Sequence, residues 1–310
     1  MKETKISFLI PAHNEEKIIE KTLINLENLP YSNYEVLLGL DGCVDGTEEI
    51  VKSFCKRNKN FKYYKLNLRQ GKPAVINSII KKATGDIIII NDADWVFNVK
   101  NNKTLNLFLS VFKGKRVGGI AESLPVEWDE EKIKKGNFGY KMVAYSSYFW
   151  FEYQKKMFTY KKINLVYLKK PKMFLTNIFR RKLYRENVTL GDDFERSASI
   201  MNDGYEIVSF DKLEMPRMIA VYDYVSIPSL FNQKVRTGMA RSQVNEIVKD
   251  KVGFFDYYLP SVIYILINSW KKGIVSGIAV LSWVVLTSFA DIISRFREKN
   301  TKKGWKLRLR

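Results

Sequence analysis

"IIIINDADW", residues 87–95, joins an uninterrupted apolar run to an amide and two carboxylates. The four isoleucines indicate a strand that is buried on both faces, because side chains in both directions are apolar. Asp92 and Asp94 follow at the tip of this strand, with only Ala93 between them. Two carboxylates at this spacing repel each other unless water or a cation lies between them. The stretch therefore predicts either a solvated strand end or a cation site.

The chain on either side of this stretch alternates between apolar strand-like runs and segments with helical periodicity. The expected strands are Lys5–Ile10, Glu35–Leu40, Phe61–Lys65, Asp86–Asn91 and Val117–Glu122. The expected helices are Glu16–Asn28, Thr47–Arg57, Lys72–Ala83 and Lys103–Lys113. Such alternation predicts an α/β fold with a mostly parallel sheet flanked by helices.

Polar loops follow three of the expected strands: "PAHNEE" (residues 11–16), "DGCVDGT" (41–47) and "NDADW" (91–95). Each loop has a plain explanation, as the acidic start of a helix, as a turn or as a solvated tip. The carboxyl ends of parallel strands share one edge of a sheet, and ligands bind there. Three such loops at one edge favour a ligand site.

Composition limits the classes of function. The 310 residues are 46% hydrophobic, which argues against wholesale disorder, and the net charge of +19 indicates anionic partners. Cys43, Cys55 and the single histidine, His13, form no zinc-ligand pattern. The apolar run at the N-terminus is too short for the core of a signal peptide. We therefore expect the catalytic part to lie in the cytoplasm.

The motifs resemble those of family 2 glycosyltransferases. The resemblance rests on "SFLIPAHNEE" (7–16), "LLGLDGCVDGT" (37–47), "RQGKPAVINSIIKKATGDIIIINDADW" (69–95), "TLGDDFERSASIMNDGYEIV" (189–208) and "QKVRT" (233–237). It implies the GT-A nucleotide-diphospho-sugar transferase fold. The chain resembles the membrane-associated members of this family, which are cellulose, chitin and hyaluronan synthase-like enzymes and lipid-linked-sugar transferases. The last motif is similar to Q-x-x-R-W of the membrane-linked, sometimes processive, members. Thr237 stands where that motif has Trp, which puts processive synthesis in doubt.

The resemblance also implies roles on the donor side of the site. Asp94 would be the direct ligand of Mn²⁺ or Mg²⁺, and Asp92 would contact the ribose or the metal. The other residues expected to bind the UDP- or GDP-sugar are Pro11, Ala12, His13, Asn14, Glu15, Asp41, Lys72, Ala93, Gln233 and Arg236. A hard divalent ion and fixed cations suit this chemistry, because negative charge grows on the departing diphosphate.

An acceptor hydroxyl needs a base, and "GDDFE" (191–195) offers the candidates. By resemblance, Asp193 is the expected catalytic base and Asp192 contacts the acceptor, although Asp192 stands where the family usually has Glu. The alternative is that these residues are only the acidic start of a helix over Phe194–Asn202. A single base and no separate nucleophile predict one displacement with inversion at the anomeric carbon.

The second half of the chain points to a membrane. Aromatic and basic residues interleave from Phe149 to Asn187, a composition that suits anionic lipid and, less well, nucleic acid. Uncharged runs cover Tyr257–Trp270 and Ile274–Ala290, and a basic tail follows. They could form a membrane hairpin, interfacial helices, a buried pair of helices, or an oligomer interface. We expect a catalytic domain of residues 1–253, followed by a membrane-associated region of residues 254–310.

Together these patterns predict an inverting, metal-dependent glycosyltransferase at the cytoplasmic face of the cell membrane. Its partners would be a UDP- or GDP-sugar, a lipid-linked or glycan acceptor and anionic lipid, with no nucleic acid. A polyprenyl-phosphate glycosyltransferase is the alternative within the same class. A basic nucleic-acid-binding protein is the alternative from a different class.

Overall fold

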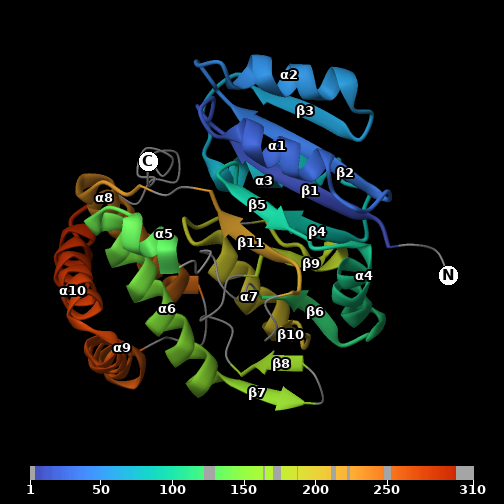
Figure 1. The fold of residues 1–310 in the computed structure, drawn as a ribbon. Helices are drawn as coiled ribbons and strands as arrows, with labels where there is room; N and C mark the ends of the chain where they lie inside the picture. Colours follow the sequence, from blue (N-terminus) through green and yellow to red (C-terminus); the bar gives the residue numbers. More distant parts are fainter. Residues whose placement is uncertain are drawn as a thin grey trace. The chain divides into compact units, whose positions relative to one another are not determined.

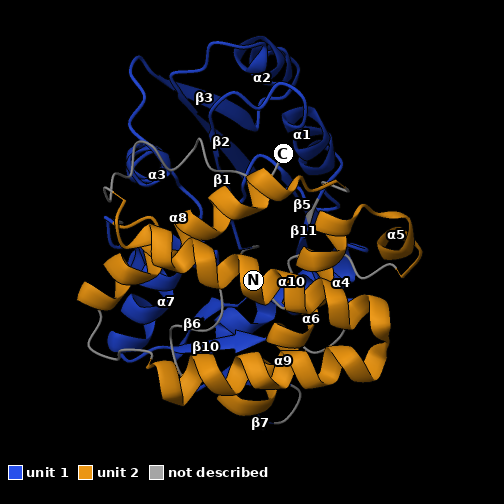
Figure 2. Ribbon diagram, turned by 90° about the vertical axis from the view of Figure 1, so that its left-hand side faces the viewer, with its two compact units in different colours: residues 1–125, 160–188, 192–221 blue, residues 126–159, 189–191, 222–310 orange. Residues whose placement is uncertain are grey.

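The computed structural model describes residues 4–121, 130–162, 165–169, 176–186, 188–210, 214–221, 224–247 and 253–297. The chain divides into two compact units, which Figure 2 shows in different colours. The first unit comprises residues 1–125, 160–188 and 192–221, and the second comprises residues 126–159, 189–191 and 222–310. The functional boundary expected at residue 253 stays a prediction. Part of the expected basic tail, residues 298–310, lies outside the described residues.

The first unit is built on a sheet with the strand order β3-β2-β1-β4-β9-β6-β10-β8-β7 (Figure 1). Its strands are β1 (Ile6–Ala12), β2 (Tyr34–Asp41), β3 (Phe61–Leu66), β4 (Ile87–Ile90), β6 (Val117–Ile120), β7 (Thr159–Lys162), β8 (Leu165–Leu168), β9 (Ile178–Arg180) and β10 (Glu206–Ser209). Strands β1 to β4 pair in parallel, as β6 and β10 do, whereas β9 runs antiparallel between β4 and β6. A second, antiparallel sheet pairs β5 (Trp95–Asn98) with β11 (Arg217–Ala220).

Helices cover both faces of the parallel part of the sheet. They are α1 (Ile19–Glu27), α2 (Thr47–Arg57), α3 (Lys72–Ile80) and α4 (Asn102–Ser110), with α7 (Asp192–Asn202) later in the chain. Alternate residues of β2 show the two faces: Val36 and Leu38 share a core with α1, α2 and α4, whereas Gly39 faces α3. A Cβ on Gly39 would lie 2.3 Å from Val75 Cγ1 of α3. Glycine therefore allows α3 to pack directly on β2.

The expected strands and helices of the first 120 residues are confirmed, with changes at their ends. The last residue of the expected strand Val117–Glu122 lies outside the described residues. The largest change at the start of an element is at α1, which begins at Ile19 rather than at Glu16. The reason lies in the loop before it. The Glu15 N–H donates to Thr47 Oγ1 at 2.7 Å, and Glu16 Oε2 accepts from the Gly46 N–H at 2.8 Å. These residues join two loops instead of forming the first turn of the helix.

The second unit is helical. It contains α5 (Glu130–Lys135), α6 (Phe138–Phe158), α8 (Ile227–Ile247), the π-helical turn η3 (Phe254–Tyr258), α9 (Leu259–Lys272) and α10 (Ile274–Ser294). Polar contacts to a buried tyrosine join its elements: Trp150 Nε1 and Gln154 Nε2 of α6 both donate to the Tyr257 hydroxyl of η3, at 2.9 and 2.8 Å. The aromatic and basic segment over 149–187 is therefore partly the end of α6, and parts of it lie outside the described residues.

Candidate active site

The turn after β4 carries the two carboxylates. Asn91 is fully buried, and its Nδ2 donates to the carbonyls of Asp92 and Trp95 at 2.8 and 2.9 Å. The Trp95 N–H closes the turn on the Asp92 carbonyl at 3.0 Å, and Thr22 Oγ1 donates to the carbonyl of buried Ala93 at 2.8 Å. The apolar strand thus ends at an amide whose hydrogen bonds fix the backbone of Asp92–Asp94.

The loop after β1 is tied to the loop after β2. Pro11 and Ala12 end β1, and Glu15 is buried. Asn14 adopts a positive φ of 55°, and its Oδ1 accepts from the Val44 N–H at 2.9 Å. His13 Nδ1 lies 2.5 Å from the Asp41 carbonyl, which can only accept, so Nδ1 carries the proton. The expected pocket residues therefore come together at one edge of the sheet.

Asp41 is fully buried and organises a further loop. Its two carboxylate oxygens accept the N–H groups of Gln70 and Gly71, at 2.7 and 2.8 Å. Gly71 immediately precedes α3, so these bonds place the first residue of that helix, Lys72. The contact expected between Asp41 and a nucleobase stays a prediction.

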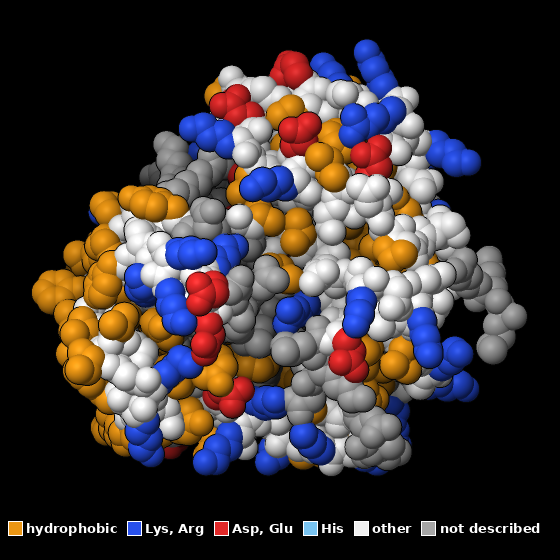
Figure 3. Space-filling model, in the orientation of Figure 1, with side chains coloured by type: hydrophobic (Ala, Val, Ile, Leu, Met, Phe, Trp, Pro, Cys, Tyr) orange, Lys and Arg blue, Asp and Glu red, His pale blue; other side chains and the backbone are white. Residues whose placement is uncertain are grey.

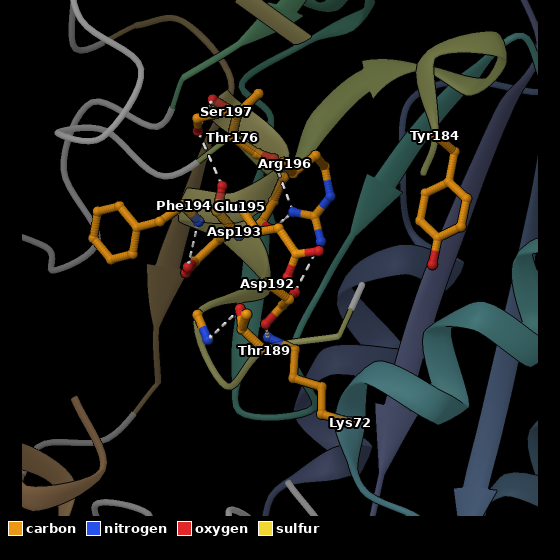
Figure 4. Close-up of polar contacts among 12 residues, drawn as sticks. Lys72, Thr176, Tyr184, Thr189, Asp192, Asp193, Phe194, Glu195, Arg196 and Ser197 are labelled. Atoms are coloured by element: carbon orange, nitrogen blue, oxygen red, sulfur yellow. Dashed lines mark hydrogen bonds and ion pairs between the residues drawn. The ribbon is translucent and has the colours of Figure 1, made fainter. Parts of the chain in front are cut away.

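Lys72 connects the turn after β4 with the start of α7, as Figure 4 shows for its α7 side. Its Nζ lies 3.0 Å from Asp92 Oδ1 and 3.5 Å from Asp192 Oδ1. Burial of the amine opposes its charge, but the carboxylates of Asp192 and Asp92 outweigh burial and raise the pKa of Lys72. The side chain therefore stays a cation between two acidic groups.

Arg196 holds Asp192 from the other side and was not expected from the sequence. Its side chain is 2% exposed, and one Nη donates to Asp192 Oδ2 at 2.8 Å. The other Nη donates to the Thr176 carbonyl at 2.9 Å and to Asn177 Oδ1 at 2.8 Å (Figure 4). The spacing of four residues between Asp192 and Arg196 could have indicated this pair, because residues four apart are neighbours on one face of a helix.

Asp193, the expected base, is half-buried at the start of α7. Its Oδ1 accepts from the Phe194 N–H at 2.8 Å. Burial raises the pKa of Asp193, and the negative charge of Asp192 raises it further, whereas Lys72 and Arg196 lower it. A carboxyl whose pKa is above its usual range is a better proton acceptor than an ordinary aspartate.

The remaining donor-side candidates, Gln233 and Arg236, lie on α8 in the second unit. Thr237, which replaces the Trp of the expected motif, donates through Oγ1 to the Gln233 carbonyl at 2.9 Å. The proposed role of Gln233 and Arg236 at the donor stays a prediction.

The donor set expected for a cation is the pair Asp92 and Asp94. Among the described residues, no three His, Cys, Asp or Glu side chains form a cluster. Mg²⁺ and similar hard ions are commonly held by one or two carboxylates together with substrate phosphates. Two carboxylates on a fixed turn therefore fit an ion that arrives with a diphosphate.

Comparison with known proteins identifies the family of the chain. The family model of glycosyl transferase family 2 matches residues 7–181. Poly-beta-1,6-N-acetyl-D-glucosamine synthase of Staphylococcus epidermidis is 36% identical over 93 residues, which are 30% of this chain and 22% of that protein. The probable glycosyltransferase YdaM of Bacillus subtilis is 37% identical over 103 residues, which are 30% of this chain and 24% of that protein. The matched stretch thus spans less than a quarter of these relatives.

A solved structure supports the fold. The mannosyltransferase PcManGT from Pyrobaculum calidifontis, in complex with GDP-Man and Mn²⁺, superposes with a TM-score of 0.54 at 17% identity. The match covers 96% of this chain and 80% of that one. The expected GT-A fold is confirmed. The expected enzyme class, a transferase, is confirmed as well.

Proposed function

The chain belongs to glycosyl transferase family 2, and we propose that it moves a sugar from a UDP- or GDP-sugar to a hydroxyl of a lipid-linked or glycolipid acceptor. The observation that carries this proposal is the network of ion pairs in which Lys72 joins Asp92 at the turn after β4 to Asp192 at the start of α7. One charged side chain thus links the expected donor side to the expected acceptor side.

On the donor side, Asp94 with Asp92 would hold Mn²⁺ or Mg²⁺, which would neutralise the departing diphosphate. The loops around His13, Asn14 and Asp41 would enclose the nucleoside. Their mutual hydrogen bonds support this role, because a pocket fixed before binding loses less conformational entropy when its ligand binds.

On the acceptor side, Asp193 would take the proton of the attacking hydroxyl. Its partial exposure and raised pKa support this role. Asp192 would contact the acceptor through Oδ1, which lies 3.5 Å from Lys72 Nζ, because Arg196 holds its Oδ2. One base implies a single displacement, so the configuration at the anomeric carbon would invert.

The proposed location is the cytoplasmic face of the cell membrane. The support is α10, a 21-residue helix long and apolar enough to cross a membrane, the one such helix in the described part of the chain. The charge of +19 adds attraction to anionic lipid.

Asp94→Asn tests the proposal. The variant should fold normally, lose Mn²⁺-dependent binding of nucleoside diphosphate in calorimetry, and lose sugar transfer. Asp86→Asn, at an acidic residue just before the same strand, is the matched control and should keep both. Transfer by Asp94→Asn at the wild-type rate would contradict the assignment of the metal ligand.

A further inference from the structure

The exposed face of α10 is a continuous apolar stripe. Its residues recur at steps of three and four, so they lie on one face of the helix. They are 44–71% exposed: Ile274, Ile278, Leu281, Val285, Phe289 and Ile292. On α9, Leu259, Ile263, Ile267 and Trp270 form a similar exposed row. We call these ten residues the apolar stripe. Figure 3 shows hydrophobic side chains gathered where Figure 1 places α10.

The opposite face of α10 is covered by protein along the helix. Near its start, Ser276 Oγ donates to the Ser269 carbonyl of α9 at 2.6 Å. Midway, Lys234 of α8 lies 4.9 Å from the centre of a Trp283 ring. Near its end, Asp291 pairs with Arg241 of α8 at 3.3 Å. The second half of α10 therefore packs on α8, a helix that carries charged side chains.

These contacts distinguish between a spanning helix and one that lies flat. If α10 crossed a bilayer, α8 would enter the hydrocarbon with Lys234 and Arg241 beside it, and buried charges in lipid are costly. A helix lying in the interface buries only its apolar face and leaves its protein-bound face undisturbed. The geometry therefore favours the flat arrangement.

The charges around the stripe indicate the partner. From Ile274 to Ala290 the sequence has no charged residue. Lys271 and Lys272 are exposed before this run, and Arg295 and Arg297 are exposed after it. Basic residues at both ends of an apolar face suit a surface that is anionic outside and apolar beneath.

We propose that the apolar stripe of α9 and α10 lies flat in the surface of an anionic membrane, so that the protein is attached to one leaflet without crossing it. This inference rests on the membrane location given under the proposed function and specifies how the protein is attached to the membrane.

The test uses the full chain and preformed vesicles of phosphatidylcholine with phosphatidylglycerol. Wild-type protein should bind these vesicles, bind pure phosphatidylcholine less, and be released by alkaline carbonate. Val285→Asp/Phe289→Asp should bind about tenfold more weakly or worse, because charge replaces apolar area that enters the interface. Ile24→Asp/Leu107→Asp, at exposed apolar residues of α1 and α4, is the matched control and should bind like wild type.

Two results would overturn the proposal. Retention of wild-type protein after carbonate would show a spanning helix. Absence of vesicle binding, together with a dimer that Val285→Asp/Phe289→Asp converts to a monomer, would show that a second copy covers the stripe. Metal-dependent nucleotide binding, measured on the same samples, reports separately on the proposed function, since the substituted residues are outside the catalytic machinery.

Discussion

Replacing Arg196 by methionine tests whether the buried network at the start of α7 is as interdependent as its geometry indicates. The change removes a side chain that is 2% exposed and leaves Asp192, which is 5% exposed, without its 2.8 Å partner. The Thr176 carbonyl and Asn177 Oδ1 lose donors as well. Breaking a buried ion pair by removing one partner costs about 3–5 kcal/mol in the free energy of unfolding.

The matched control is Arg57→Met. Arg57 pairs with the carboxylate of Glu27 through two hydrogen bonds and, like Arg196, lies over an aromatic ring, but its side chain is 48% exposed. An exposed pair of this kind contributes about 0–1 kcal/mol. The two variants therefore compare the same chemistry in a buried and in an exposed setting.

Urea unfolding followed by circular dichroism, with hydrogen exchange of the α7 amides as the local measurement, would give the difference. In an Asp192→Asn background, Arg196→Met should cost only about 1–2 kcal/mol, because no buried carboxylate then loses its counter-charge. Equal costs for Arg196→Met and Arg57→Met would refute the reasoning.

Three further predictions concern catalysis and pH. Asp193→Asn should bind nucleotide and metal normally but lose acceptor-dependent transfer by orders of magnitude in single-turnover assays; normal transfer would favour a phosphate acceptor, which needs no base. In wild type, the transfer rate should fall on acidification at a pH above the usual aspartate range, because a base must be deprotonated and burial raises the pKa of Asp193. Burial and the charges of Arg241 and Arg236 lower the pKa of Lys234 to about 8. Between about pH 8 and about pH 10.4 the unfolded chain therefore binds more protons than the folded chain, so the free energy of unfolding should rise with pH across this range. In urea titrations at several pH values, Lys234→Met should lose this rise.

Local patterns made much of the fold predictable. The strand before Asn91 and the alternation of strands and helices were predictable from hydrophobic periodicity alone. That alternation in turn predicted the parallel pairing of β1 with β2 and β4. The turn that carries Asp92 and Asp94 was predictable because polar residues ended an apolar strand.

Contacts between distant parts of the chain were not predictable. Lys72 was expected near a diphosphate, but its position between Asp92 and Asp192 depends on how α3 and α7 pack against the sheet. Asp41 looked like a ligand-binding residue, whereas its bonds to Gln70 and Gly71 are backbone contacts that no spacing reveals. The helix α6 was missed because its aromatic residues lie on all sides of the helix, which hides a helical period.

Because Gly39 has no side chain, substitutions at this position affect activity in a way that is easily misinterpreted. Any larger residue there would meet Val75 Cγ1 at 2.3 Å and Ile79 Cγ2 at 3.1 Å, and would push α3 away from the sheet. Lys72 is the first residue of that helix and would move with it. In a survey of natural or random variants scored by activity, Gly39 would therefore behave like an active-site position, although it lies in a strand beneath the helix. Measuring the protein abundance of the same variants as well would distinguish a residue such as Gly39, which only lets α3 pack on the sheet, from residues that contact the substrate.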